Sequence, residues 1–396
     1  MTLDPLQTLT LAAAILLLGR FLNGRIGVLT RYNIPQPITG GLAFAVLTTV
    51  LHLGFGFDID VSGGLRGPLL LAFFATVGLS ADLGRLRAGG PRLVLFLACV
   101  VPFLVVQNVA GVGMALMLDQ HPLIGLLAGT ITLVGGHGTG AAYAQIFSDT
   151  HALSGVAGMA MAAATCGLIL GGVVGGPVAQ YLLRGRPTLA EGGAQTSAAG
   201  PGEAAEVTTE STIVTVALVM FCLLAGGWLA AMMADAPVAL PDFLWCLFCG
   251  VLLRNLLAPA VRLPVNDAAV DLVGGIALAL FLSMTMTTLR LWELAALAGP
   301  LLVIVAVQAV VAVLYAVLVV YRVMGRNYEA AVMSAGFLGF SMGATATAIA
   351  NMQAVAGRYG AAPVAFLVVP LTGAFFIDLA NALVLTGALA LPVFGE

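Results

Sequence analysis

The stretch TLVGGHGTGAA (132–142) places four glycines and one histidine within a strongly apolar region of the chain. A glycine in a helix interior costs about 1 kcal/mol relative to alanine, so four glycines within six residues predict an interrupted helix. Glycines also let backbone N–H groups approach a ligand closely, and the N-terminus of a helix that resumes there attracts anions. The candidate binding residues of this stretch are Gly136, His137, Gly138, Thr139 and Gly140.

A second stretch, in the other half of the chain, has the same character. LLAGTITLVGGHG (126–138) aligns with MSAGFLGFSMGAT (333–345) at a shift of 207 residues, which places Gly136 on Gly343. Nearby, CGLILGG (166–172) aligns with TGAFFID (372–378) at a shift of 206 residues. The second stretch offers hydroxyl and amide groups beside its glycines, and its candidate residues are Ser341, Gly343, Thr345, Thr347 and Asn351.

The composition is that of a membrane protein. Only 8% of the 396 residues are charged, 61% are hydrophobic, and the mean hydropathy is +1.08. A soluble domain carries about 25% charged residues, and long apolar runs bounded by arginines favour membrane helices over a β-barrel. A net charge of −3 gives no reason to expect a nucleic-acid partner. The pair Cys246 and Cys249 forms a CxxC, for which packing is the ordinary interpretation and a redox or metal role the alternative.

Ten apolar runs of about 20 residues predict spanning helices, near 5–22, 37–55, 66–83, 91–117, 153–183, 212–234, 241–258, 269–288, 300–321 and 361–391. Two further apolar segments, about 122–150 and 328–358, are interrupted by glycine and hydroxyl residues. The expected domains are a repeat over 1–184, a flexible linker over 185–211 and a second repeat over 212–396.

The arginines indicate how the interrupted segments cross. If each segment enters and leaves on one side, each half has five spans, and 13 of the 15 arginines then lie inside when the N-terminus is outside. Only Arg66 and Arg290 fall outside, as the positive-inside rule favours. This topology puts both termini outside and the linker inside.

An odd number of spans per repeat turns the second half upside down relative to the first. The predicted fold is therefore an all-α polytopic membrane protein with ten transmembrane helices in two inverted five-helix repeats, each with a re-entrant hairpin. Inverted repeats with matching interrupted segments are the pattern of a secondary transporter and indicate its binding site. Exposed backbone at membrane depth is tolerable only inside protein or beside a water-filled cavity.

Nine stretches resemble the bacterial sodium/glutamate symporters: LAFFATVGL (71–79), LRAGG (86–90), GLLAGTITL (125–133), GGHGTGAA (135–142), GLILGG (167–172), LWELA (291–295), ATAIANMQA (346–354), AFLVVP (365–370) and GAFFID (373–378). The resemblance covers nearly the whole chain. It implies the ten-span inverted-repeat fold with two re-entrant loops. In the bacterial inner membrane, the arginine distribution then makes both termini periplasmic and the linker cytoplasmic. It also implies a scaffold domain that supports a homodimer, and sodium-coupled glutamate uptake by an elevator-like movement of a transport domain.

Within that family, sodium is the expected coupling ion and glutamate the expected substrate. Every arginine lies in a loop or at a span end, so the helix N-termini at the hairpin tips are the available positive groups for glutamate. Asp378 is expected to bind sodium or the substrate ammonium, because a carboxylate inside a membrane is costly and usually functional. The expected sodium ligands are Asp378, Asn381, Thr345 and Asn351. The alternative is that Asp378 accepts hydrogen bonds from the backbone of a hairpin.

Four other polar residues have two interpretations each. His137 contacts the substrate or fixes the fold of its hairpin. Gln107, Asn108 and Gln308 lie in matching spans, where interhelical hydrogen bonding is the ordinary role and direct ligation the alternative.

Other functions are also weighed. GFSMG (339–343) fits the nucleophile elbow of a serine hydrolase, but the pattern is short and no strand precedes it, so no enzyme is expected. A channel could use paired re-entrant loops, yet Asp378 and two unlike tips suit a coupled carrier better. Within transporters, the alternative is a proton- or sodium-coupled carrier of another small anionic amino acid or a dicarboxylate.

Overall fold

The fold is almost entirely helical. A computed structural model describes the chain except for residues 1, 32–33, 56–59, 62–63, 185–205, 234–239, 261–262, 288–297 and 395–396. Within the described residues, two short strands, β1 (Thr2–Leu3) and β2 (Asp60–Val61), pair in parallel. The predicted linker over 185–211 lies outside the described residues up to residue 205.

The chain packs into two compact units, and each unit draws on both halves of the sequence. The first unit comprises Met1–Gly84 and Glu203–Trp292, and the second comprises Arg85–Gly202 and Glu293–Glu396. The packing units therefore cut across the two sequence repeats, because helices from each repeat pack with their counterparts from the other.

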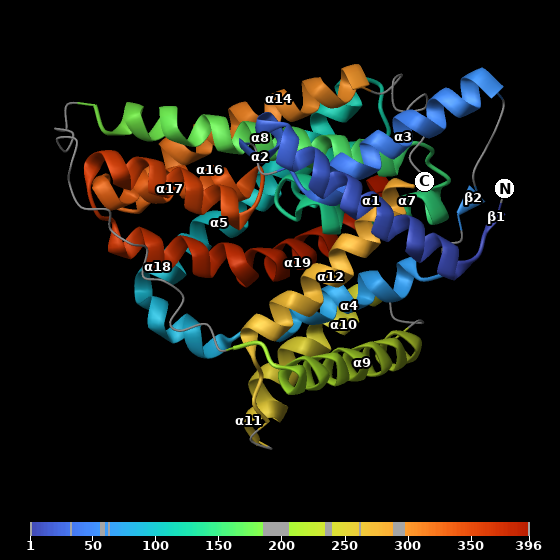
Figure 1. The fold of residues 1–396 in the computed structure, drawn as a ribbon. Coiled ribbons are helices and arrows are strands. Elements are labelled where there is room, and N and C mark those ends of the chain that lie inside the picture. Colours follow the sequence, from blue (N-terminus) through green and yellow to red (C-terminus); the bar gives the residue numbers. More distant parts are fainter. Residues whose placement is uncertain are drawn as a thin grey trace. The chain divides into compact units, whose positions relative to one another are not determined.

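The first unit is built from apolar helices that pack through small residues. Its helices are α1 (Pro5–Arg25), α2 (Gly27–Arg31), α3 (Gln36–Phe55), α4 (Arg66–Leu79), α9 (Thr209–Met232), α10 (Asp242–Leu252), the π-helical turn η2 (Leu253–Leu257), α11 (Ala258–Ala260) and α12 (Asp267–Met286) (Figure 1). Asp4 begins α1 with a capping box, and Thr208 does the same for α9. Cys246 and Cys249 lie in the apolar core of this unit, which supports packing as their role.

The second unit contains the two glycine-rich stretches. Its elements are α5 (Leu83–Met117), α6 (Pro122–Leu126), η1 (Leu127–Ile131), α7 (Gly136–His151), α8 (Val156–Leu182), α14 (Ala298–Tyr315), η3 (Ala316–Val320), α15 (Tyr321–Val323), α16 (Tyr328–Ser341), α17 (Thr345–Tyr359), α18 (Pro363–Leu371), η4 (Thr372–Phe376), α19 (Ile377–Leu389) and η5 (Pro392–Phe394). Helix α5 starts at the end of the first unit and is interrupted at Gly90, where φ is 60°. Phe103 and Phe337 pack edge to face in the core of the second unit.

The helices confirm a polytopic membrane protein. Each of the ten predicted apolar runs holds a helix, and eight helices of the described chain are long and apolar enough to cross a membrane. The other two runs hold α4, which has 14 residues, and α18 with α19, which are separated by the π-helical turn η4. These two segments were predicted as spans because each is an apolar run of about 20 residues, although the helices within them are shorter.

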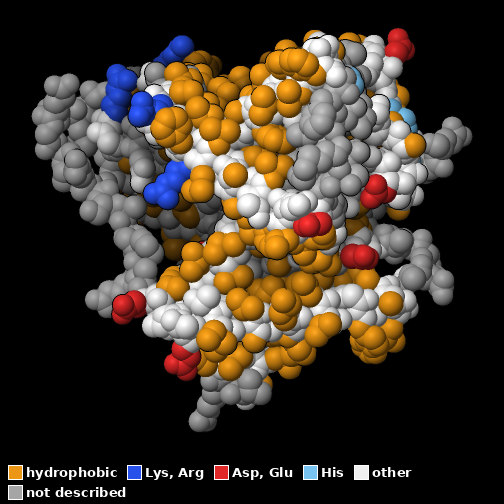
Figure 2. All heavy atoms as spheres, turned by 45° about the vertical axis from the view of Figure 1, so that its right-hand side comes forward, with side chains coloured by type: hydrophobic (Ala, Val, Ile, Leu, Met, Phe, Trp, Pro, Cys, Tyr) orange, Lys and Arg blue, Asp and Glu red, His pale blue; other side chains and the backbone are white. Residues whose placement is uncertain are grey.

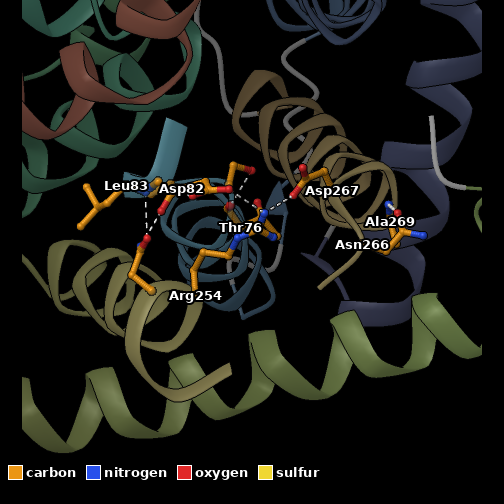
Figure 3. Close-up of polar contacts among 11 residues, drawn as sticks. Thr76, Asp82, Leu83, Arg254, Asn266, Asp267 and Ala269 are labelled. Atoms are coloured by element: carbon orange, nitrogen blue, oxygen red, sulfur yellow. Dashed lines mark hydrogen bonds and ion pairs between the residues drawn. The ribbon is translucent and has the colours of Figure 1, made fainter. Parts of the chain in front are cut away.

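A cluster of charges in the first unit was not anticipated. Arg254 lies in η2 with only 12% of its side chain exposed, and it forms ion pairs with Asp267 at 2.8 Å and Asp82 at 3.5 Å (Figure 3). The next residue, Asn255, accepts a hydrogen bond from the Leu83 backbone N–H at 2.8 Å and donates one to the Ala81 carbonyl at 2.6 Å. Together these contacts hold the end of α4 where the chain leaves the first unit.

Removing the charge of Arg254 is expected to destabilise the first unit. The variant Arg254→Gln leaves two carboxylates without their shared cation, and breaking a largely buried pair costs more than breaking an exposed one. We expect a lower midpoint of thermal unfolding in detergent, with unchanged apparent affinities for transported solutes. Arg20→Gln is the control, because Arg20 is exposed on α1. Equal midpoints for Arg254→Gln and Arg20→Gln would refute a stabilising role for the cluster.

Candidate functional site

The first glycine-rich stretch forms a helical hairpin in the second unit. Its incoming arm, α6 and η1, is broken at Gly129, where φ is −99° and ψ is −134°. The chain reverses after Val134 and resumes as α7 at Gly136, whose φ of 66° is left-handed. At the other end of the hairpin, the rings of His121 and His151 lie 6.3 Å apart. The helix is therefore interrupted at the glycines of this segment, and its two ends, at His121 and His151, lie near each other.

The second stretch forms a matching hairpin of α16 and α17, which lie side by side (Figure 1). The chain reverses at Met342–Ala344, where the Ala344 N–H donates to the Gly339 carbonyl at 3.1 Å. At the open end, the Tyr328 hydroxyl donates to the Gly360 carbonyl, which ties the two arms together. Unlike the first hairpin, this one has an unbroken incoming arm.

The tips of the two hairpins lie next to each other within the second unit. A Cβ built on Gly136 would lie 3.9 Å from the Gly343 carbonyl oxygen, the nearest heavy atom of the described residues outside its own helix and chain neighbours. Gly343 in turn packs against Leu168 of α8. An ideal Cβ on Gly343 would lie 3.1 Å from the Leu168 Cα. The helices α7 and α17 therefore begin at neighbouring tips, and their N-termini lie close together, as a shared anion site requires.

His137 contacts another helix of the same unit. Its Nε2 lies 3.1 Å from the Thr165 hydroxyl of α8. This bond supports the interpretation in which His137 fixes the hairpin, while a contact of His137 with substrate stays a prediction. Gly138, Thr139 and Gly140 follow in the first turns of α7, and Gly138 and Gly140 are buried.

The polar residues of the second hairpin mostly fasten it to its neighbours. The Asn351 amide donates to the Gly171 carbonyl at 2.9 Å and to the Ala335 carbonyl at 3.2 Å. The Thr345 hydroxyl donates to the Gly373 carbonyl at 2.7 Å. Two other buried hydroxyls, those of Ser341 and Thr347, have no hydrogen-bond partner among the described residues.

Asp378 and Asn381 share one face of α19, because residues three apart on a helix are neighbours. The Asn381 amide donates to the Thr130 carbonyl of the first hairpin at 3.0 Å. Asn381 therefore lies against the first hairpin, whereas Thr345 and Asn351 bond to η4, α8 and α16. The sequence did not predict this contact of Asn381 with the broken incoming arm at Gly129 and Thr130.

Three buried carboxamides join α5 to the two hairpins and α14 to α5. Gln107 donates to the Ser341 carbonyl at 3.2 Å, and Gln308 donates to the Gln107 carbonyl at 2.8 Å. Asn108 accepts hydrogen bonds from the Thr130 N–H at 3.1 Å and the Thr130 hydroxyl at 2.9 Å. These bonds confirm the interhelical role that the sequence favoured. Thr130 was missed, and the only sequence signal for it was the glycine before it.

Comparison with known proteins identifies the family. The family model described as sodium/glutamate symporter matches residues 1–361. The chain belongs to the sodium/glutamate symporter family. It is 47% identical over 398 residues, 99% of each chain, to sodium/glutamate symporters of Escherichia coli (strain K12) and Shigella flexneri. It is 44% identical over 391 residues to the sodium/glutamate symporter of Haemophilus influenzae, covering 97% of this chain and 96% of that one.

Family membership confirms the resemblance seen in the sequence motifs. The protein is a membrane transporter of the sodium-coupled glutamate symport class and not an enzyme. The GFSMG stretch accordingly forms the tip of a helical hairpin, with Ser341 at the end of α16, rather than the strand-to-helix turn of a nucleophile elbow.

Proposed function

We propose that this chain imports glutamate together with sodium by alternating access, and that the two hairpin tips form the glutamate site. The observation that carries the proposal is the approach of Gly136 to Gly343. Two helix N-termini at one place offer partial positive charge to the two carboxylates of glutamate. The proposed substrate contacts come from Gly136, His137, Gly138, Thr139, Gly140, Ser341, Gly343, Thr345, Thr347 and Asn351.

The proposed topology has ten spans, periplasmic termini, a cytoplasmic linker and hairpins that enter from opposite sides. Contacts within each unit support it, because they join segments that this topology assigns to one side. On the periplasmic side, β1 pairs with β2, and the Arg66 side chain reaches the Met284 carbonyl at 3.4 Å. On the cytoplasmic side, Asn266 donates to the Glu206 carbonyl at 3.2 Å. In the second unit, α6 contacts η5 near the C-terminus, and the proposed topology assigns both elements to the periplasmic side.

We propose that Asp378, Asn381, Thr345 and Asn351 take part in sodium binding. Asp378 would supply the negative charge that offsets the cation, since an ionisable residue within a membrane span is a functional hypothesis by default. Asn381, Thr345 and Asn351 would add neutral oxygen atoms. Breaks in transporter helices commonly provide such ion sites.

The second unit is the proposed transport domain, because it contains both hairpins, and the first unit is the proposed scaffold. An elevator-like movement of the second unit would expose the site to either side of the membrane in turn. A homodimer formed through the first unit would fix the scaffold while the second unit moves. Figure 2 shows hydrophobic side chains over much of one face with few charges. Exposed residues such as Leu53, Leu224 and Trp228, each more than 60% exposed, suit contact with lipid.

Purified protein in liposomes tests the function directly. We expect concentrative uptake of labelled glutamate when sodium is higher outside, and no accumulation when potassium replaces sodium. A proton gradient imposed without a sodium gradient is the control for the coupling ion. Uptake driven equally by protons alone, or accumulation of another dicarboxylate in place of glutamate, would favour the alternative carrier.

A further inference from the structure

The last turns of α1 line a groove on the surface of the first unit. The groove has a volume of about 440 Å³ and is lined by Leu17, Arg20, Phe21, Gly24 and Arg25. At 3.6 residues per turn, the two arginines lie about 140° apart around α1, and the other three residues lie between them. The groove therefore has a cation at each edge and an uncharged floor.

Gly24 keeps the floor of this groove open. No heavy atom of the described residues lies within 4 Å of an ideal Cβ on Gly24, so packing against the rest of the protein does not require a glycine there. Glycine also weakens a helix interior relative to alanine. A ligand that lies against the backbone of α1 would account for this residue, because glycine lets another molecule approach closely.

The two arginines have no anionic partner within the described chain. Arg254 is the arginine that forms ion pairs there, and neither Arg20 nor Arg25 forms one. The guanidinium carbon of Arg25 lies 5.1 Å from the centre of the Phe21 ring, a cation–π contact that holds the charge over the groove. The acidic cap of α1, Asp4, lies at the opposite end of the helix. Both cations are therefore available to an external anion.

The floor of the groove is apolar and faces outward. Leu17 and Phe21 are 66% and 57% exposed, and they belong to a helix that is long and apolar enough to cross a membrane. Leu17 lies about two turns further into this span than Arg25. A ligand that fills the groove must therefore carry a negative charge at the end of the span and a hydrocarbon chain deeper in it.

We propose that this groove binds an anionic phospholipid, with its phosphate between Arg20 and Arg25 and an acyl chain along Leu17 and Phe21. Guanidinium groups bind phosphate oxygens through paired, charge-assisted hydrogen bonds. Basic pockets beside membrane helices on the cytoplasmic side bind lipid head groups. The choice of the cytoplasmic leaflet rests on the proposed topology, whereas the site itself does not depend on what the protein transports.

Native mass spectrometry of the purified full chain, released from detergent, measures its affinity for dioleoyl phosphatidylglycerol. We expect Arg20→Gln and Arg25→Gln each to weaken binding about fivefold, the contribution of one basic residue to the attraction of anionic lipid. Arg184→Gln is the matched control, because Arg184 is also exposed beside an aromatic ring, that of Tyr181, but does not line the groove. Its binding should equal that of the parent.

Gly24→Leu distinguishes a shaped site from general attraction to positive charge. The variant keeps both arginines and favours the helix, so it should fold, but its side chain fills the floor of the groove. We expect binding to weaken as much as in the loss of one arginine. Gly227→Leu is the control, since Gly227 of α9 is equally open around its Cβ position.

Parent-like binding by Gly24→Leu would overturn the proposal, as would equal affinity of the parent for phosphatidylcholine, whose head group carries no net charge. Displacement of the lipid by an equal concentration of inorganic phosphate would assign the groove to a soluble anion instead. If the parent binds no phosphatidylglycerol and the same variants dissociate a dimer, a second copy of the chain covers this face. Failure of the proposed transport function would be seen separately, as absence of sodium-driven glutamate uptake by the parent protein.

Discussion

Asp378→Asn is expected to abolish sodium-driven glutamate uptake or to weaken its sodium dependence about tenfold or more, which corresponds to a loss of about 1.4 kcal/mol of binding free energy. The substitution keeps the size of the side chain and removes its charge. A sodium ion buried in a membrane protein needs a compensating negative charge, and no neutral amide can provide it. Folding and expression should change little, because an asparagine is easier to bury than a carboxylate.

The measurement is uptake at a series of external sodium concentrations with glutamate held at saturation. Asp149→Asn is the control, since Asp149 is an exposed aspartate of the same unit. We expect the control to follow the parent curve. If the sodium concentration for half-maximal uptake by Asp378→Asn equals that of the parent, Asp378 is structural and the sodium site lies elsewhere.

The helices and hairpins could be predicted because their causes are local. A run of about 20 apolar residues is a membrane span wherever it packs, and the cluster of glycines around Gly136 interrupts a helix whatever its neighbours are. The glycine-rich tip and the predicted hairpin bounds of 122–150 therefore agree closely with α6–α7. The approach of the two tips is in keeping with the repeat, since matching segments take matching positions in an inverted fold.

The contacts of the candidate site could not be predicted, because they join residues far apart in the chain. His137 forms a hydrogen bond with Thr165, and Asn351 forms one with the α8 backbone. Neither contact can be inferred from the spacing or periodicity of the residues. The break at Gly129 was hidden for another reason. Gly129 aligns with Gly336, yet α16 runs unbroken through Gly336, so the same residue type has different backbone geometry in the two repeats.

The partition into two units also has a nonlocal cause. Sequence order separates the repeats at the linker, but packing joins α4 of the first half with α10 and α12 of the second. The Arg254 cluster belongs to this packing, because its acidic partners come from both halves of the chain. An arginine counted as a cytoplasmic marker therefore turns out to hold the end of α4 as well.

Gly136→Val is expected to eliminate glutamate uptake. The tip requires a φ of 66° at this residue, and a left-handed backbone costs a side-chain-bearing residue about 1–2 kcal/mol, with β-branched residues tolerating it least. The space around the Cβ position is open towards Gly343, so the added side chain would also stand where the two tips face each other. Both effects act at the proposed substrate site.

Gly136→Asn separates the two effects, because asparagine tolerates a left-handed backbone far better than valine does. We expect Gly136→Asn to fold like the parent, as judged by its thermal unfolding, and yet to transport poorly, since its side chain still occupies the space between the tips. Substantial uptake by Gly136→Asn together with none by Gly136→Val would show that the tip needs only its backbone conformation. Normal uptake by Gly136→Val would place glutamate away from the tips, because a buried substrate site between Gly136 and Gly343 cannot accommodate a branched side chain without displacing its ligand.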